Sequence, residues 1–153
     1  MYKKIFIYSF IFLLIDQLSK LLINLNMDLN ESIELINNFF SITYVHNIGA
    51  AFSLLPGNRL LFIIIAIFVL GIIYLFFIKN QKLNKLEVIS YSLLISGIIG
   101  NLIDRIIFGY VLDFLDFNIF GYNFAIFNFA DSFIVISVSL LIIGLLGEKK
   151  CKN

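Results

Sequence analysis

Two aspartates stand in apolar surroundings where hydrolytic chemistry would be possible. Asp113 lies within residues 110–115 and Asp131 within residues 127–133, both among large apolar side chains. Two carboxyl groups close together in a low dielectric cannot both ionise easily, so they share a proton. One then acts as a base towards water, while the other donates a proton to the reacting carbonyl group. Asp113 and Asp131 are therefore the candidate catalytic pair.

Further polar side chains lie inside or at the ends of apolar stretches, where a charge at the bilayer centre costs about 2.5–3.5 kcal/mol. They are Asp16, Lys20, Asn101, Asp104 and Arg105. Asp16 and Lys20 are spaced i,i+4 with the acid first, so a simple intrahelical ion pair or a functional role would explain them. Asn101 and Arg105 share one helix face. Asp104 and Arg105 could instead anchor a helix end at the membrane interface.

Several other kinds of chemistry are excluded. His46 is the only histidine and Cys151 the only cysteine, and the topology predicted below puts them on opposite sides of a membrane. The sequence therefore offers no suitable set of residues for Cys–His or Ser–His–Asp catalysis. Neither a disulfide nor a Cys/His zinc site can form. We expect no metal and no cofactor, and we interpret Cys151 as a tail thiol without a role. The net charge of +1 gives no electrostatic basis for binding nucleic acid.

The composition predicts an α-helical integral membrane protein. The 153 residues are 61% apolar and 14% charged, whereas soluble proteins are roughly 45–50% apolar and about 25% charged. Four stretches reach the length of about 20 residues that a spanning helix needs, at about residues 5–25, 60–78, 86–108 and 129–147. The first resembles a signal peptide, but Asp16 interrupts it and no A-x-A-like cleavage site follows, so we interpret it as a retained span. We expect a single membrane-embedded domain over residues 1–153.

The connections between these stretches predict a small β-type cradle. Residues 40–46 alternate and are rich in β-branched and aromatic residues, which indicates a strand or short hairpin. The sequence Pro56-Gly57-Asn58 predicts a turn before the second span. Residues 109–128 contain two glycines and many aromatic residues, and we expect a second short strand-and-turn segment there.

The basic residues predict the orientation. Eight of the eleven lie at the N-terminus, in the loop of residues 79–85 and at the C-terminus, while the two other connections carry acids. The positive-inside rule then places both termini in the cytoplasm. Asp16 lies roughly 18 Å along its helix from Lys4 at 1.5 Å per residue, past the midplane. Asp104 ends the third span and Asp131 opens the fourth, so the polar residues converge on the outer face. Asn128, three residues before Asp131, suits a helix N-cap.

With these residues in place, the sequence resembles the lipoprotein signal peptidases, the type II signal peptidases of bacteria. Five blocks in order carry the resemblance. They are Asp16-Gln17-Leu18-Ser19-Lys20, His46-Asn47-Ile48-Gly49-Ala50-Ala51-Phe52-Ser53, Gly100-Asn101-Leu102-Ile103-Asp104-Arg105, Val111-Leu112-Asp113-Phe114 and Phe127-Asn128-Phe129-Ala130-Asp131.

The resemblance implies a membrane aspartic endopeptidase with Asp113 and Asp131 as its catalytic dyad. It implies removal of the signal peptide from diacylglyceryl-modified prolipoproteins, by cleavage on the amino side of the lipidated cysteine, in the bacterial cytoplasmic membrane. The residues expected to support catalysis or bind substrate are Asp16, Lys20, Asn47, Gly49, Asn101, Asp104, Arg105, Asn128 and Ala130. Nothing in the sequence demands a partner chain, so we expect a monomer that contacts membrane lipid.

Two other functions also suit intramembrane acids. A small proton- or ion-coupled transporter would place its acids near the midplane, accessible from both faces. A noncatalytic assembly subunit would explain charges at helix ends, but not two acids in aromatic frames.

Overall fold

The structure, a computed structural model, describes residues 1–49 and 57–150. The Ala50–Ser53 part of the second motif block, Pro56 and Cys151 lie outside the described residues. The helices are α1 (Tyr2–Asn26), α2 (Arg59–Ile72), which the π-helical segment η2 (Ile73–Ile78) continues, α3 (Lys85–Ile107) and α4 (Phe129–Lys150). Within the described ranges, four helices are long and apolar enough to cross a membrane. The predicted fold class, a four-helix integral membrane protein, is confirmed.

Helix α1 shows that its solvent is lipid. Its buried residues, Ile5, Ser9, Asp16 and Lys20, form one stripe at helical spacing and are mostly polar. The large apolar side chains point outwards, with Phe6 exposed at 73% of its surface. A helix in water buries its apolar face, so this inverted arrangement is expected only where the surroundings are apolar.

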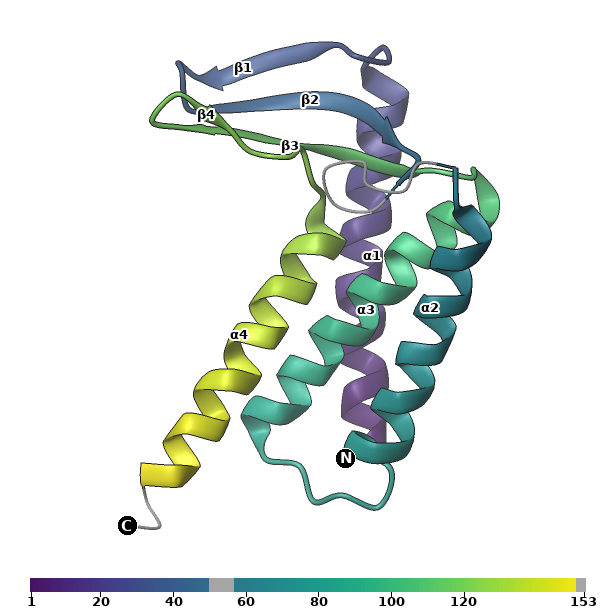
Figure 1. The fold of residues 1–153 in the computed structure, drawn as a ribbon, viewed down its shortest axis with the longest axis vertical. Coiled ribbons are helices and arrows are strands. Elements are labelled where there is room, and N and C mark those ends of the chain that lie inside the picture. Colours follow the sequence, from purple (N-terminus) through teal and green to yellow (C-terminus); the bar gives the residue numbers. More distant parts are fainter. Residues whose placement is uncertain (50–56, 151–153) are drawn as a thin grey trace.

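Helix α3 lies at the centre of the bundle and contacts α1, α2 and α4 (Figure 1). Small residues allow the close approach of α4, since a Cβ atom at Gly97 would come within 2.7 Å of the Ile134 side chain. Hydroxyl groups join the helices, with Ser9 donating to the Ser92 carbonyl and Ser137 to the Ser90 carbonyl. Small residues and hydroxyls are the usual means of helix contact in a bilayer.

A four-stranded antiparallel sheet lies across one end of the bundle (Figure 1), in the order β1 (Ser32–Ile36), β2 (Phe40–Asn47), β3 (Val111–Ile119) and β4 (Tyr122–Asn123). The strands predicted at residues 40–46 and within 109–128 are present. The additional strand β1 was not predicted, because it is an edge strand with every residue exposed. The start of α1 and the end of α4 lie at the opposite end of the bundle.

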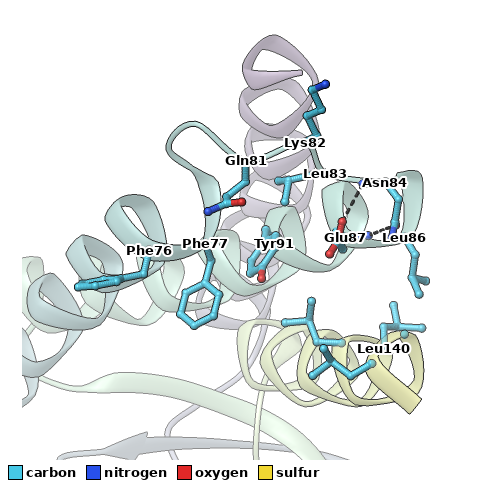
Figure 2. Close-up of a pocket in the computed structure, with 13 residues that line it drawn as sticks. Phe76, Phe77, Gln81, Lys82, Leu83, Asn84, Leu86, Glu87, Tyr91 and Leu140 are labelled. Atoms are coloured by element: carbon cyan, nitrogen blue, oxygen red, sulfur yellow. Dashed lines mark hydrogen bonds between the residues drawn. The ribbon is translucent and has the colours of Figure 1, made fainter. Parts of the chain in front are cut away.

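A cavity of about 400 Å³ lies at the end of the bundle away from the sheet. Figure 2 shows its walls, which include Phe76, Tyr91 and Leu140, beside the capping box in which Asn84 and Glu87 exchange hydrogen bonds at the start of α3. None of the predicted site residues lines it. Asp113 and Asp131 lie instead at the sheet end, beside β2 and the start of α4.

Candidate active site

Asn128 joins the two candidate acids. It directly precedes α4, and its side-chain oxygen accepts a hydrogen bond from the Asp131 backbone N–H at 2.9 Å, as a helix N-cap does. The Asp131 carboxylate accepts in return from the Asn128 backbone N–H at 3.4 Å. The Asn128 amide Nδ2 donates to Asp113 Oδ1 at 2.6 Å. One side chain therefore caps the helix that carries Asp131 and also contacts the carboxyl group of Asp113.

Strand pairing sets the position of Asp113. It lies opposite Val45 in the β2–β3 ladder, so Asn47, two residues further along β2, projects from the same face of the sheet. Asn47 Nδ2 donates to Asp113 Oδ2 at 2.9 Å. On the other side of β3, Leu115 and Phe127 exchange backbone hydrogen bonds of 2.7 and 3.1 Å. These bonds tether the segment that leads into α4, so the backbones bearing the two acids are joined.

Asn101 connects Asp131 to the interior of the bundle. Its amide Nδ2 donates to Asp131 Oδ1 at 2.7 Å, and its Oδ1 accepts from Lys20 Nζ at 3.1 Å and from Asn128 Nδ2 at 3.2 Å. An ammonium group can only donate hydrogen bonds. Lys20 therefore fixes which end of the Asn101 amide faces Asp131.

A buried ion cluster lies beneath this network. Lys20 Nζ is 2.9 Å from Asp16 Oδ2 and 2.8 Å from Asp104 Oδ2, and all three side chains are at most 5% exposed. Asp16 also accepts from the Ala130 backbone N–H at 2.8 Å, and Asp104 from that of Leu112 at 3.3 Å. The pair of Asp16 and Lys20 is thus one part of a cluster that holds α1, α3, β3 and the start of α4 together. The burial of Asp104 does not fit an interfacial anchor.

Arg105 connects the site to the loop after β2. Its guanidinium donates to the Gly49 carbonyl at 3.0 Å and to the Asn101 carbonyl at 3.3 Å, and it lies 5.0 Å from the centre of the Phe62 ring. The buried Gly49 donates its N–H to Asn47 Oδ1 at 3.0 Å. Arg105 interacts electrostatically with both candidate acids. The cation therefore lies beside the acid pair and also holds Gly49, which in turn holds the Asn47 side chain.

Sequence reasoning assigned no role to Gln17. Its Nε2 donates to Asp16 Oδ2 and to Asp104 Oδ1, both at 3.1 Å, and so bridges two carboxylates that would otherwise repel each other. Like Asn101, Gln17 is a neutral amide inside an apolar stretch, but it was not singled out. Its position beside Asp16 in an apolar stretch was the available signal.

The sole histidine lies outside the acid pair. The His46 ring stacks on Tyr110 with centroids 3.6 Å apart, and its Nε2 is 2.8 Å from the Tyr44 hydroxyl. That hydroxyl donates to Asn24 Oδ1 at 2.6 Å. This aromatic cluster fixes the sheet to the end of α1, which keeps β3 and Asp113 in place above the helices.

Burial gives Asp113 the properties of an acid that can hold a proton. Its side chain is 1% exposed, and burial, with the nearby negative charge of Asp131, raises its pKa from 3.8 to about 7. The hydrogen bonds from Asn47 and Asn128 act in the opposite direction and limit the rise. Asp131 is only half-buried. The described residues contain no group of three or more metal-binding side chains, and the arrangement suits two acids that share a proton.

Comparison with known proteins identifies the family. Residues 8–147 match the model of the family described as signal peptidase (SPase) II. The chain is 45% identical to the lipoprotein signal peptidase of Staphylococcus haemolyticus, with 92% of this chain and 89% of the relative aligned. It is 44% identical to the lipoprotein signal peptidase of Halothermothrix orenii, with 95% of this chain and 97% of the relative aligned. A solved bacterial membrane enzyme superposes with a TM-score of 0.90 at 41% identity, over 97% of this chain and 91% of that one. The chain belongs to the signal peptidase II family.

Proposed function

We propose that Asp113 and Asp131 are the catalytic dyad with which this enzyme removes the signal peptide from prolipoproteins. The substrate carries a diacylglyceryl group on its lipobox cysteine, and cleavage occurs on the amino side of that cysteine. The observation that carries the proposal is the contact of Asn128 with both acids, at 2.6 Å from Asp113 and 2.9 Å from the Asp131 backbone N–H. The lipoprotein signal peptidases similar to this chain support the substrate class.

The two acids have different roles. Asp113 is the more buried, and the rise of its pKa to about 7 lets its carboxyl group hold a proton up to near neutral pH. Asp131 is half-buried, so its carboxyl group is the more accessible of the two to water, and it accepts a hydrogen bond from Asn101 at 2.7 Å. Asp113 is therefore the initial acid and Asp131 the initial base.

The reaction then follows the usual logic of a proton-sharing carboxyl pair. Asp131 accepts a proton from water as the water oxygen bonds to the scissile carbonyl carbon, and Asp113 donates its proton to the carbonyl oxygen. In the second step the C–N bond breaks. Asp131 gives its proton to the leaving nitrogen, and Asp113 regains one from the diol hydroxyl, so the pair returns to its starting state.

The surrounding residues orient the dyad. Asn47, Asn101 and Asn128 hold the carboxyl groups by hydrogen bonds. Asp16, Lys20, Asp104 and the Ala130 backbone fix the elements on which these residues lie. Arg105 holds Gly49, which donates to Asn47, and the two residues form part of the surface over which substrate binds.

The enzyme lies in the bacterial cytoplasmic membrane as a monomer, with both termini in the cytoplasm and the dyad at the outer face. Lys3, Lys4, Lys79, Lys82 and Lys85 support this orientation, because they belong to the ends of the helices and the loop opposite the sheet. Location of the acids at the sheet end alone favours a peptidase over a proton-coupled transporter, whose acids need access from both faces. A membrane-impermeant maleimide should label the single cysteine, Cys151, only after cells are permeabilised.

Substitution of each acid tests the dyad. Asp113→Asn and Asp131→Asn should each abolish cleavage of a purified diacylglyceryl-modified precursor in detergent, while the protein remains folded and abundant. Asp116→Asn, which changes an acid of the same strand further from the pair, is the matched control and should retain activity. Cleavage by either dyad variant would show that the two acids are not the catalytic pair.

A further inference from the structure

The cavity at the end of the bundle away from the sheet holds a buried hydroxyl group without a hydrogen-bond partner. The cavity measures about 400 Å³ and lies between η2, the start of α3 and residues 140–145 of α4. Tyr91 lines it and is only 8% exposed, yet its hydroxyl group makes no hydrogen bond within the described part of the chain. Figure 2 shows this hydroxyl group turned towards the cavity. Buried polar groups are normally hydrogen-bonded, so this group is available to a ligand.

Glu87 brings a negative charge into the same cavity. Its Oε2 accepts the Asn84 backbone N–H at 2.7 Å, while its Oε1 accepts from no other described residue. Lys82 also lines the cavity, but Figure 2 shows its side chain pointing away from Glu87. Among the residues whose side chains the structure describes, the ion pairs all belong to Lys20. The Glu87 carboxylate is therefore free to bind a cation.

The walls of the cavity suit a cation that has an apolar stem. Phe76 and Phe77 belong to the π-helical segment η2, and the Phe77 ring lies 6.2 Å from the Tyr91 ring. Leu140 of α4 closes the opposite side in Figure 2. Aromatic faces attract cations, and π-helical turns are frequent at functional sites. Lysine and arginine side chains combine an apolar stem with a charged end.

Glu87 is aligned with the proposed active site. The 18 positions from Glu87 to Arg105 correspond to about five turns of α3 at 3.6 residues per turn, so the two side chains share one helix face. They lie about 27 Å apart along the axis, at 1.5 Å per residue. Arg105 interacts with both candidate acids and contacts Phe62 of α2. The cavity and the acid pair therefore lie at two ends of the same face of α3, which runs between α2 and α4 (Figure 1).

We propose that this cavity binds a basic side chain from the N-terminal region of the signal peptide, and that Glu87 and Tyr91 hold its charged end. The proposal rests on the proposed function and adds a second contact with the same substrate. A signal peptide places a positively charged segment before its apolar segment, within roughly 15–30 residues. A helix of about 18 residues covers about 27 Å. A precursor whose lipobox reaches the acid pair therefore brings its basic segment to the level of Glu87.

Kinetics with two substrates test the charge contact. One is a purified diacylglyceryl-modified precursor with lysines in its N-terminal region, and the other carries glutamines in their place. In neutral detergent, wild type should process the lysine form with a kcat/KM about tenfold higher, the effect expected of one charge-assisted hydrogen bond. Glu87→Gln, which keeps an acceptor for the capping box, should process both forms equally. Tyr91→Phe should discriminate less than wild type does.

Glu34→Gln is the matched control, because it removes an exposed acid of β1 at the other end of the molecule. It should retain the discrimination of wild type. Equal kcat/KM values for the two substrates with wild type would overturn the proposal, and so would full discrimination by Glu87→Gln. Neither result would affect the dyad, which the aspartate variants test separately.

Cross-linking tests the position of the substrate without catalysis, so it can be carried out with the Asp113→Asn variant. In a Cys151→Ser background, Leu140→Cys in the cavity wall should form a disulfide with a precursor that carries a cysteine beside an N-terminal lysine. The lipobox cysteine cannot compete, because its sulfur carries the diacylglyceryl group. Ile142→Cys is the control, since Ile142 is 52% exposed and does not line the cavity. A disulfide with Ile142→Cys instead, or with neither variant, would place the basic segment elsewhere and overturn the proposal.

Discussion

The acid pair should make the protein less stable as the pH rises, and Asp113→Asn should remove this effect. Burial and the charge of Asp131 raise the pKa of Asp113 from 3.8 to about 7. In the unfolded chain the carboxyl group ionises near its ordinary value, while the folded protein resists ionisation. The folded state then binds more protons than the unfolded state, so the free energy of unfolding falls between these two pKa values and is constant above about 7.

The magnitude follows from the size of the shift. At about 1.36 kcal/mol per pKa unit, the rise from 3.8 to about 7 corresponds to a loss of about 4 kcal/mol. Because Asp113 is 1% exposed, little of this is screened by solvent. Asparagine would leave one of the two amide donors, on Asn47 or Asn128, without an acceptor, which costs about 1–3 kcal/mol at every pH. That cost lowers the free energy of unfolding by the same amount at every pH, so it does not change how steeply stability depends on pH.

The assay is chemical unfolding in detergent micelles from about pH 4 to about pH 8. Wild type should lose about 3–4 kcal/mol of stability relative to Asp113→Asn across this range. The variant should therefore be close to wild type or less stable in acid, and more stable above neutral pH. Asp28→Asn, which removes an exposed acid between α1 and β1, controls for the loss of one negative charge. Parallel curves for wild type and Asp113→Asn would refute the assignment of a proton to Asp113.

Three further predictions concern packing, the ion cluster and the pH profile. Gly97→Ala should cost about 1–3 kcal/mol, because its Cβ would press against α4, whereas Gly71→Ala, with open space around it, should be neutral or stabilising in thermal unfolding. Lys20→Met should cost about 3–5 kcal/mol in the same assay, since it leaves two carboxylates buried without a cation. Asn47→Ala removes a hydrogen bond that lowers the pKa of Asp113, so the alkaline fall in kcat/KM should move to higher pH; an unchanged profile would count against Asp113 as the initial acid.

Most of the framework could be predicted because lipid and water impose strong patterns on a sequence. Apolar stretches of about 20 residues predicted the spans, and alternation predicted the strand at residues 40–46. Strand β1 escaped prediction since both of its faces are exposed. The π-helical turn η2 escaped because its residues are uniformly apolar. In η2 the residue pattern did not distinguish the observed structure from an ordinary helix, whereas in β1 the short alternation of Ser32-Ile33-Glu34-Leu35 follows directly on other polar residues.

At the site, the sequence predicted which polar side chains lie in the interior better than it predicted which of them contact each other. The cost of placing a charge in the membrane singled out Lys20, but the i,i+4 spacing predicted only Asp16 as its partner. The contact of Lys20 with Asp104 at 2.8 Å depends on how α1 and α3 pack. Gln17 bridges two carboxylates, and its position beside Asp16 did not show that it would reach Asp104 on another helix. Residue types therefore predicted which groups would be retained in the interior. Only the packing of the helices decided which of those groups would meet.

The charges gathered at this site favour the retention of a proton there. Among the described residues, four carboxyl groups, those of Asp16, Asp104, Asp113 and Asp131, interact with two cations. Lys20 is already shared by two carboxylates, and the Arg105 guanidinium donates to backbone carbonyls. If all four acids were ionised, two negative charges would be left uncompensated in surroundings of low dielectric, where such charges are costly. A proton on the pair removes one of these two charges and so lowers the electrostatic cost. A carboxyl pair that holds one proton has the acid and the base that peptide hydrolysis needs.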